Sequence, residues 1–155
     1  MAIVLWACSN ADDKVDEAFI KGLKEKQLEK SAYFISLPPD FTIQISEGPD
    51  FYVYYFYPAD TTLKGSYSGG IYIGNYPSDF KPESDSCTTE TVSGKILNQV
   101  RDWTIYICNG RFTVQTIVEN KPNDGWDEKL HVFGYGSSKK EINKLLAIFS
   151  TLRKK

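Results

Sequence analysis

Apolar residues recur at helical spacing in the first part of the chain and alternate with polar ones from about residue 41. Residues 12–30 predict a helix, because five small or apolar positions form one stripe. These positions are Val15, Ala18, Phe19, Gly22 and Leu23. The later alternation is typical of half-buried strands. It predicts strands at 41–45, 51–57, 71–73, 103–108, 111–118 and 130–135. In 51–57 the large side chains alternate onto both faces of the strand, which favours an interior strand covered on two sides.

The dipeptide Asn109-Gly110 between two alternating runs predicts a hairpin, because both residues adopt the positive φ angles of a type I′ turn. A turn of these residues puts Ile107 opposite Phe112 on an apolar face. The opposite face is more polar and carries Cys108 beside the turn.

A second helix is predicted near the C-terminus, where Ser138-Lys139-Lys140-Glu141 forms a capping box. Its apolar stripe must cover a sheet face and consists of Ile142, Leu145, Leu146, Phe149 and Leu152. We expect the basic run Arg153-Lys154-Lys155 to close this helix, where cations meet the negative end of the helix dipole.

Three polar or glycine-rich segments predict connections between these elements. Residues 65–70 lack the ending of a phosphate-binding loop and favour a hairpin connection. Residues 79–94 have almost no apolar anchor and predict a long surface loop, and 120–125 is dense in turn formers. The fold expected is α+β, with an antiparallel sheet of about six strands packed against an N-terminal and a C-terminal helix. Residues 12–155 would form this single domain.

Charge and composition narrow the class of protein. The chain has 155 residues, of which 41% are hydrophobic, enough for one domain with a core of its own. Its 18 basic and 20 acidic side chains are mostly interspersed and give a net charge of −2. This balance provides no basic footprint for a phosphate backbone, so nucleic acid is not an expected partner.

The N-terminal residues resemble a targeting signal. Residues 1–6 are apolar, and Leu5-Trp6-Ala7-Cys8 resembles a bacterial lipoprotein cleavage box. The resemblance implies that Cys8 is lipidated, that residues 1–11 are a signal remnant and tether, and that the domain is held at the cell envelope facing the periplasm. The apolar run is short and has no basic residue before it, so packing of these residues on the domain is the alternative. No stretch is long enough to span a membrane.

Two further cysteines, Cys87 and Cys108, suggest a disulfide if the domain is exported. In the chain-entropy model a loop of this length is worth roughly 3 kcal/mol of stability. In a reducing compartment the same residues would be free thiols.

The segment Phe34-Ile35-Ser36-Leu37-Pro38-Pro39-Asp40-Phe41 looks like the opening of PsbP-like proteins. The run 130–133 followed by the helix at 142–152 looks like their closing unit. This resemblance to the PsbP-like family, which includes many small bacterial lipoproteins, covers most of 31–155. It implies an α+β fold and a non-catalytic tendency, and it transfers no functional residue.

The sequence contains few residues that could form a catalytic or metal-binding site. A Ser-His-acid hydrolase would need His131, which lies in an alternating strand and is better explained as a hydrogen-bonded strand residue. A single His cannot supply a standard zinc site, and 123–128 lacks the calcium-loop spacing. A hydrolase that uses a pair of carboxylates is an alternative that the sequence does not exclude. We therefore expect no enzyme, no metal and no cofactor.

Binding is the function class that the sequence favours. Trp126 falls in a turn where it could anchor an interface or fold back over the sheet edge, and Tyr67, Tyr72 and Tyr76 near the glycine-rich segment are further candidates. The leading expectation is a non-catalytic, envelope-anchored domain that binds another protein, for example as an inhibitor or immunity partner of a toxin or enzyme. The alternative is a glycan or aromatic compound in a cleft between 65–70 and the Trp126 turn.

Overall fold

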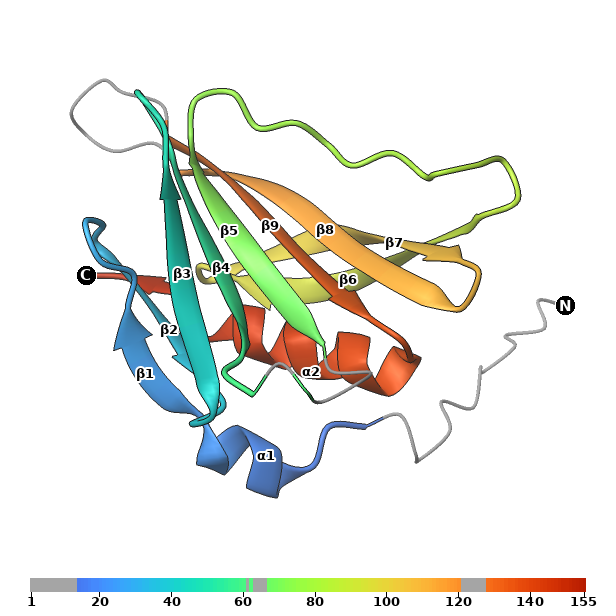
Figure 1. The fold of residues 1–155 in the computed structure, drawn as a ribbon, viewed down its shortest axis with the longest axis horizontal. Coiled ribbons are helices and arrows are strands. Elements are labelled where there is room, and N and C mark those ends of the chain that lie inside the picture. Colours follow the sequence, from blue (N-terminus) through green and yellow to red (C-terminus); the bar gives the residue numbers. More distant parts are fainter. Residues whose placement is uncertain (1–13, 61, 63–66, 121–127) are drawn as a thin grey trace, which may run out of the picture.

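The computed structural model describes residues 14–60, 62, 67–120 and 128–155. Strands in this part of the chain form two antiparallel sheets, one of three strands in the order β1-β2-β10 and one of seven in the order β3-β4-β5-β9-β8-β7-β6 (Figure 1). The small sheet consists of β1 (Lys24–Gln27), β2 (Tyr33–Leu37) and β10 (Arg153–Lys154). The large sheet consists of β3 (Phe41–Glu47), β4 (Tyr52–Pro58), β5 (Ser68–Gly74), β6 (Thr88–Ile96), β7 (Gln99–Cys108), β8 (Arg111–Asn120) and β9 (Glu128–Gly136). The helices are α1 (Glu17–Gly22) and α2 (Lys139–Ser150).

The expected α+β fold with about six strands between two helices is wrong. Among the described residues, strands account for 53% and helices for 14%, and the strands belong to two sheets. The predicted surface loop at 79–94 contains much of β6, the edge strand of the large sheet. Most side chains of β6 are exposed, and the strand is held by its backbone pairing with β7. Its sequence therefore lacks the alternation of apolar and polar residues by which a half-buried strand is recognised.

The predicted N-terminal helix at 12–30 is also mostly wrong. Helix α1 covers only Glu17–Gly22, and Leu23 then takes an extended conformation. Residues 24–27 form β1 against β2, and Leu28 is fully buried at the end of this strand. The residues after Leu23 are good helix formers, but intrinsic propensity is a weak preference that tertiary pairing overrides.

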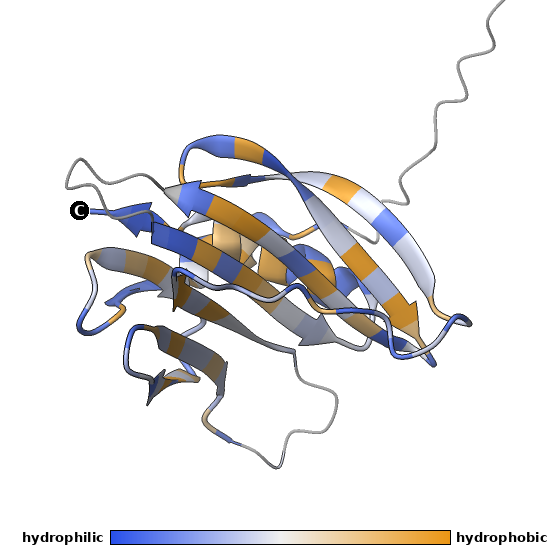
Figure 2. Ribbon diagram, turned by 90° about the horizontal axis from the view of Figure 1, so that it is seen from above, coloured by the Kyte–Doolittle hydropathy of each residue, from blue (hydrophilic) through white to orange (hydrophobic). Residues whose placement is uncertain are grey.

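Helix α2 covers the inner face of the large sheet, the face on which the hydrophobic core lies (Figure 2). The capping box is confirmed, since the Ser138 side chain accepts a hydrogen bond from the Glu141 backbone N–H. Of the predicted stripe, the helix buries Ile142, Leu145 and Phe149, together with Ile148, which the prediction omitted. Leu146 is only partly buried, and Leu152 is buried but lies beyond the end of the helix. Phe149 stacks on Trp103 of β7 with 5.2 Å between ring centroids. These contacts join the helix to the middle of the sheet.

The predicted hairpin at Asn109-Gly110 is confirmed. Both turn residues have positive φ angles, and Ile107 pairs with Phe112 as expected. The prediction that 51–57 is covered on both faces is wrong, because Tyr55 of β4 is 41% exposed. The sheet is therefore closed on its inner face and accessible on its outer face.

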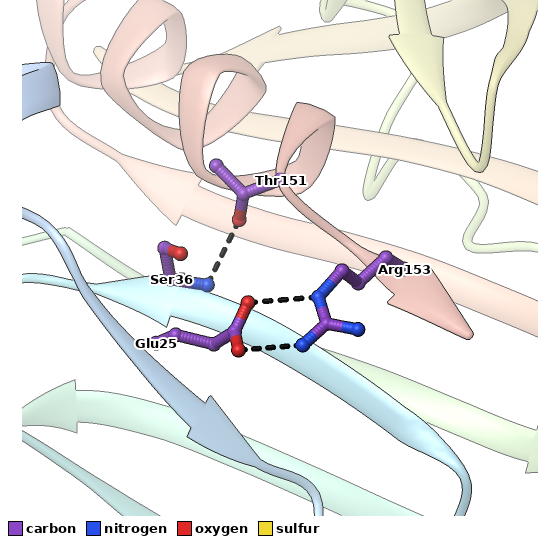
Figure 3. Close-up of polar contacts among 4 residues, drawn as sticks. All are labelled: Glu25, Ser36, Thr151 and Arg153. Atoms are coloured by element: carbon purple, nitrogen blue, oxygen red, sulfur yellow. Dashed lines mark hydrogen bonds and ion pairs between the residues drawn. The ribbon is translucent and has the colours of Figure 1, made fainter. Parts of the chain in front are cut away.

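The chain end belongs to the small sheet, so the expectation that 153–155 closes a helix is wrong. Helix α2 ends at Ser150, and Arg153 of β10 forms a two-point ion pair with Glu25 of β1 at 2.6 and 2.8 Å (Figure 3). The Ser36 backbone N–H donates to the Thr151 hydroxyl over 2.9 Å. These polar contacts join β1 and β2 to the end of the chain that follows α2.

Gly134 of β9 offers a test of the contact between α2 and the sheet. A Cβ atom at this position would lie 2.7 Å from Leu145 of α2 and 3.2 Å from the Ser68 backbone oxygen. We predict that Gly134→Ala lowers the free energy of unfolding by about 1–3 kcal/mol, the usual cost of overpacking. Gly22→Ala is the matched control, because nothing lies within 4 Å of a Cβ there. Equal unfolding midpoints in urea for the two variants would contradict this packing.

Candidate functional site

The outer face of the large sheet, which points away from α2, carries rows of side chains that cross several strands. Thr113 of β8 lies between Tyr106 of β7 and Tyr135 of β9. Next to this row, Gln115 of β8 is the direct neighbour of Phe133 of β9. Because directly opposite residues in a sheet point to the same side, these side chains form one continuous surface. Aromatic rings dominate its centre.

A long connection between β5 and β6, residues 75–87, runs along this outer face on the side opposite to α2 (Figure 1). We call it the strap. Its attachment in the middle is Phe80, whose ring centroid lies 4.7 Å from that of His131 and 5.0 Å from that of Phe133. The strap is thus pinned to the sheet by one aromatic side chain among other rings.

Gln115 holds the backbone of the strap at the same point. Its Nε2 donates to the Phe80 carbonyl and its Oε1 accepts from the Phe80 N–H, both over 2.9 Å. The same Oε1 lies 2.8 Å from Nε2 of His131. Since an amide oxygen can only accept, Nε2 of His131 is the donor and carries the ring proton. We call Phe80, Gln115 and His131 the clasp.

His131 is 3% exposed and lies below the Phe80 ring. Burial lowers the pKa of His131, and the nearby carboxylate of Asp79 partly opposes this shift. Its hydrogen bond to Gln115 and its contact with Phe80 give His131 a structural role. The prediction that His131 is a hydrogen-bonded residue of a strand is confirmed.

A pocket of about 600 Å³ opens between the strap and the sheet next to the clasp. The sheet contributes Tyr106, Thr113 and Tyr135 to its lining, and the strap contributes residues 79–83. Arg111 and Cys108 line it at the end of the β7–β8 hairpin. Its volume falls in the range of about 300–1,000 Å³ typical of sites for small ligands.

The predicted disulfide between Cys87 and Cys108 is present, with 4.6 Å between the two Cα atoms. Thr88 pairs with Ile107, so the cysteines face each other just beyond the paired part of β6 and β7. Cys108 also lines the pocket. The disulfide therefore fixes the end of the strap beside the pocket.

The tyrosines predicted as binding residues do not form one site. Tyr67 packs against Phe41 with 5.3 Å between centroids, and burial raises the pKa of Tyr67 to about 12. Tyr72 stacks on Phe51, and its hydroxyl accepts from the backbone N–H of Tyr76, which is 78% exposed. Tyr72 and Tyr76 are thus neighbours, and Tyr67 belongs to the core.

Two of the predicted site residues, Cys8 and Trp126, lie outside the described residues. The cleft expected between 65–70 and the Trp126 turn falls largely on residues outside the described ranges. The pocket in the described part of the chain is lined by the strap and by residues of β7, β8 and β9.

Sequence reasoning missed the residues that line the pocket. The alternation around Asn109-Gly110 does assign Tyr106, Thr113 and Gln115 to the polar face of the hairpin. The useful signal was Phe80, an isolated aromatic residue in an otherwise polar segment, because such a ring must find an apolar surface elsewhere.

Within the described ranges, no group of three or more His, Cys, Asp or Glu side chains could hold a metal ion. In the same part of the chain, no helix has the length and apolar character needed to cross a membrane.

Comparison of the chain with protein-family models, with curated proteins and with solved structures found no match. The resemblance to the PsbP-like family stays a prediction, and the site has to be interpreted from its own chemistry.

The buried His131 makes stability depend on pH. Its folded-state pKa is below the ordinary histidine value of about 6.5, so the unfolded chain binds the proton more readily. The stabilising contribution is complete above the unfolded pKa and is lost as pH falls from about 6.5 through the folded pKa. We predict that wild type loses more unfolding free energy than His131→Phe between pH 7.5 and pH 5.

The chain has one His, so NMR titration of its ring protons provides a direct check. A His131 pKa at or above 6.5, or the same pH dependence of stability in both proteins, would contradict the buried clasp.

Proposed function

We propose that this protein is a non-catalytic binding domain whose ligand site is the pocket between the strap and the outer face of the large sheet. The observation that carries the proposal is the pocket of about 600 Å³ with an aromatic and polar lining. Apolar walls with a few polar groups are the usual composition of small-ligand sites. This favours a small molecule with a ring, the class expected as the alternative to a protein partner.

The clasp supports a binding role because it prepares the pocket in advance. Phe80, which lines the pocket, is held by its ring contacts and by both of its backbone hydrogen bonds to Gln115. The disulfide at Cys108 holds the strap a few residues further along. A preformed wall reduces the entropy lost when a ligand binds.

The state of His131 argues against a catalytic role for this side chain. The ring is 3% exposed, its Nε2 is engaged by Gln115, and Phe80 lies over it. A general base must reach the proton that it abstracts, directly or through one water molecule. His131 has its own internal partner and a cover, which is the arrangement of a structural residue.

A protein partner is the second candidate, and one observation favours it. Tyr55 and Tyr135 are 41% and 44% exposed on the same outer face. Tyrosine is enriched in protein interfaces. In this version of the proposal a partner covers the outer face and inserts a side chain into the pocket.

We also propose that the domain is tethered by a lipid at Cys8 to the bacterial envelope and faces the periplasm. The Cys87–Cys108 disulfide supports this location, because disulfides persist in oxidising compartments. The membrane contact in this proposal is the lipid anchor alone, and nucleic acid is not a partner.

A screen of ring-containing fragments by ligand-observed NMR tests the proposed site. We predict that fragments bind wild type and that Thr113→Trp, which fills the floor of the pocket, abolishes their binding. Thr91→Trp is the matched control, because Thr91 is an exposed residue of β6 that does not line the pocket. The proposal fails if no fragment binds wild type or if Thr113→Trp binds fragments as well as wild type does.

A further inference from the structure

The floor of the pocket is a slot bounded by two tyrosines. Tyr106 and Tyr135 are the direct neighbours of Thr113 on either side, and all three line the pocket. Adjacent strands lie about 4.8 Å apart, so the backbones of the two tyrosines are separated by about 10 Å. A ring in van der Waals contact on both of its faces needs about 7 Å between the flanking rings. A planar ring placed over Thr113 would therefore lie within reach of both tyrosines.

The same face already binds one ring in this way. The Phe80 ring lies 5.0 Å from that of Phe133 and 6.1 Å from that of Tyr135. Tyr135 thus has Phe80 as a neighbour and also lines the open slot. Burial, together with the neighbouring Tyr55, raises the pKa of Tyr135, which keeps its phenol neutral. A ligand ring would extend an existing aromatic cluster.

Arg111 supplies charge at the mouth of the slot. It lies two positions before Thr113 on β8, which puts both side chains on the same face, and it pairs with Cys108 at the end of the hairpin. Arg111 has no ion-pair partner among the described residues. The planar guanidinium of an arginine can donate two parallel hydrogen bonds to a carboxylate. The other charged residues of the lining, Asp79, Lys81 and Glu83, belong to the strap.

We propose that the slot binds a planar aromatic carboxylate, with its ring between Tyr106 and Tyr135 and its carboxylate on Arg111. This inference rests on the proposed function and adds the chemical class of the ligand. A glycan ring lacks a flat π-face and an acidic group by default, and a neutral aromatic compound leaves Arg111 without a partner.

Two probes of nearly the same shape separate the ring from the charge: 2-naphthoate, and its neutral amide, 2-naphthamide. We predict that wild type binds 2-naphthoate about tenfold more tightly than the amide, the size expected of one charge-assisted contact. Titration followed by protein NMR should shift the Thr113 methyl signal. Arg111→Gln should remove the preference and leave amide binding unchanged.

Tyr135→Leu and Tyr106→Leu should weaken both probes about fivefold or more, as expected for loss of ring stacking. Tyr57→Leu is the control, because Tyr57 lies on β4 and does not line the pocket. Spectra that agree with wild type away from the pocket show that each variant is folded.

Two results would overturn the inference, and they differ in what they say about the proposed function. Equal affinity for both probes with the Thr113 shift retained rejects the carboxylate and leaves a ring-binding pocket. Absence of any shift at Thr113 with either probe rejects this ligand class, and the fragment screen with Thr113→Trp then decides on the pocket itself.

Discussion

The two hydrogen bonds between the Gln115 side chain and the backbone of Phe80 are the interaction on which the site depends. They satisfy the backbone N–H and the carbonyl of Phe80, which has no strand partner. The strap can therefore lie close to the outer face of the sheet. The Phe80 ring adds apolar contact at the same point, and His131 orients the Gln115 amide from below. Without this attachment the strap would not form one wall of the pocket.

The inner side of the molecule provides the rigid support for this arrangement. Helix α2 packs on the large sheet through Leu145 at Gly134 and through the stack of Phe149 on Trp103. The small sheet closes beside it, with Arg153 bound to Glu25. Strands β7, β8 and β9 are thereby held from below, and their outer rows of side chains keep the spacing that the pocket requires. Binding sites on strands are positioned more accurately than sites made of loops alone.

The sequence predicted a turn and a helix start, because each depends on only a few neighbouring residues. The Asn109-Gly110 hairpin and the Ser138 cap follow from backbone geometry, and both are confirmed. Edge strand β6 and the short β1 were missed, because backbone pairing with distant strands holds them and their side chains are largely exposed. The pocket was missed for a related reason. Its two walls are far apart in sequence, and they are brought together by the Gln115 contact to Phe80, the ring contacts of Phe80 and the disulfide.

Amide hydrogen exchange at Phe80 tests the central claim most directly. If the clasp holds the strap, the Phe80 N–H exchanges slowly in wild type, and Gln115→Leu removes this protection while the core strands keep theirs. Gln44→Leu is the control, since Gln44 lies on β3 and bonds the Tyr57 hydroxyl. Exchange of the wild-type Phe80 amide at the rate of an exposed loop would contradict the account.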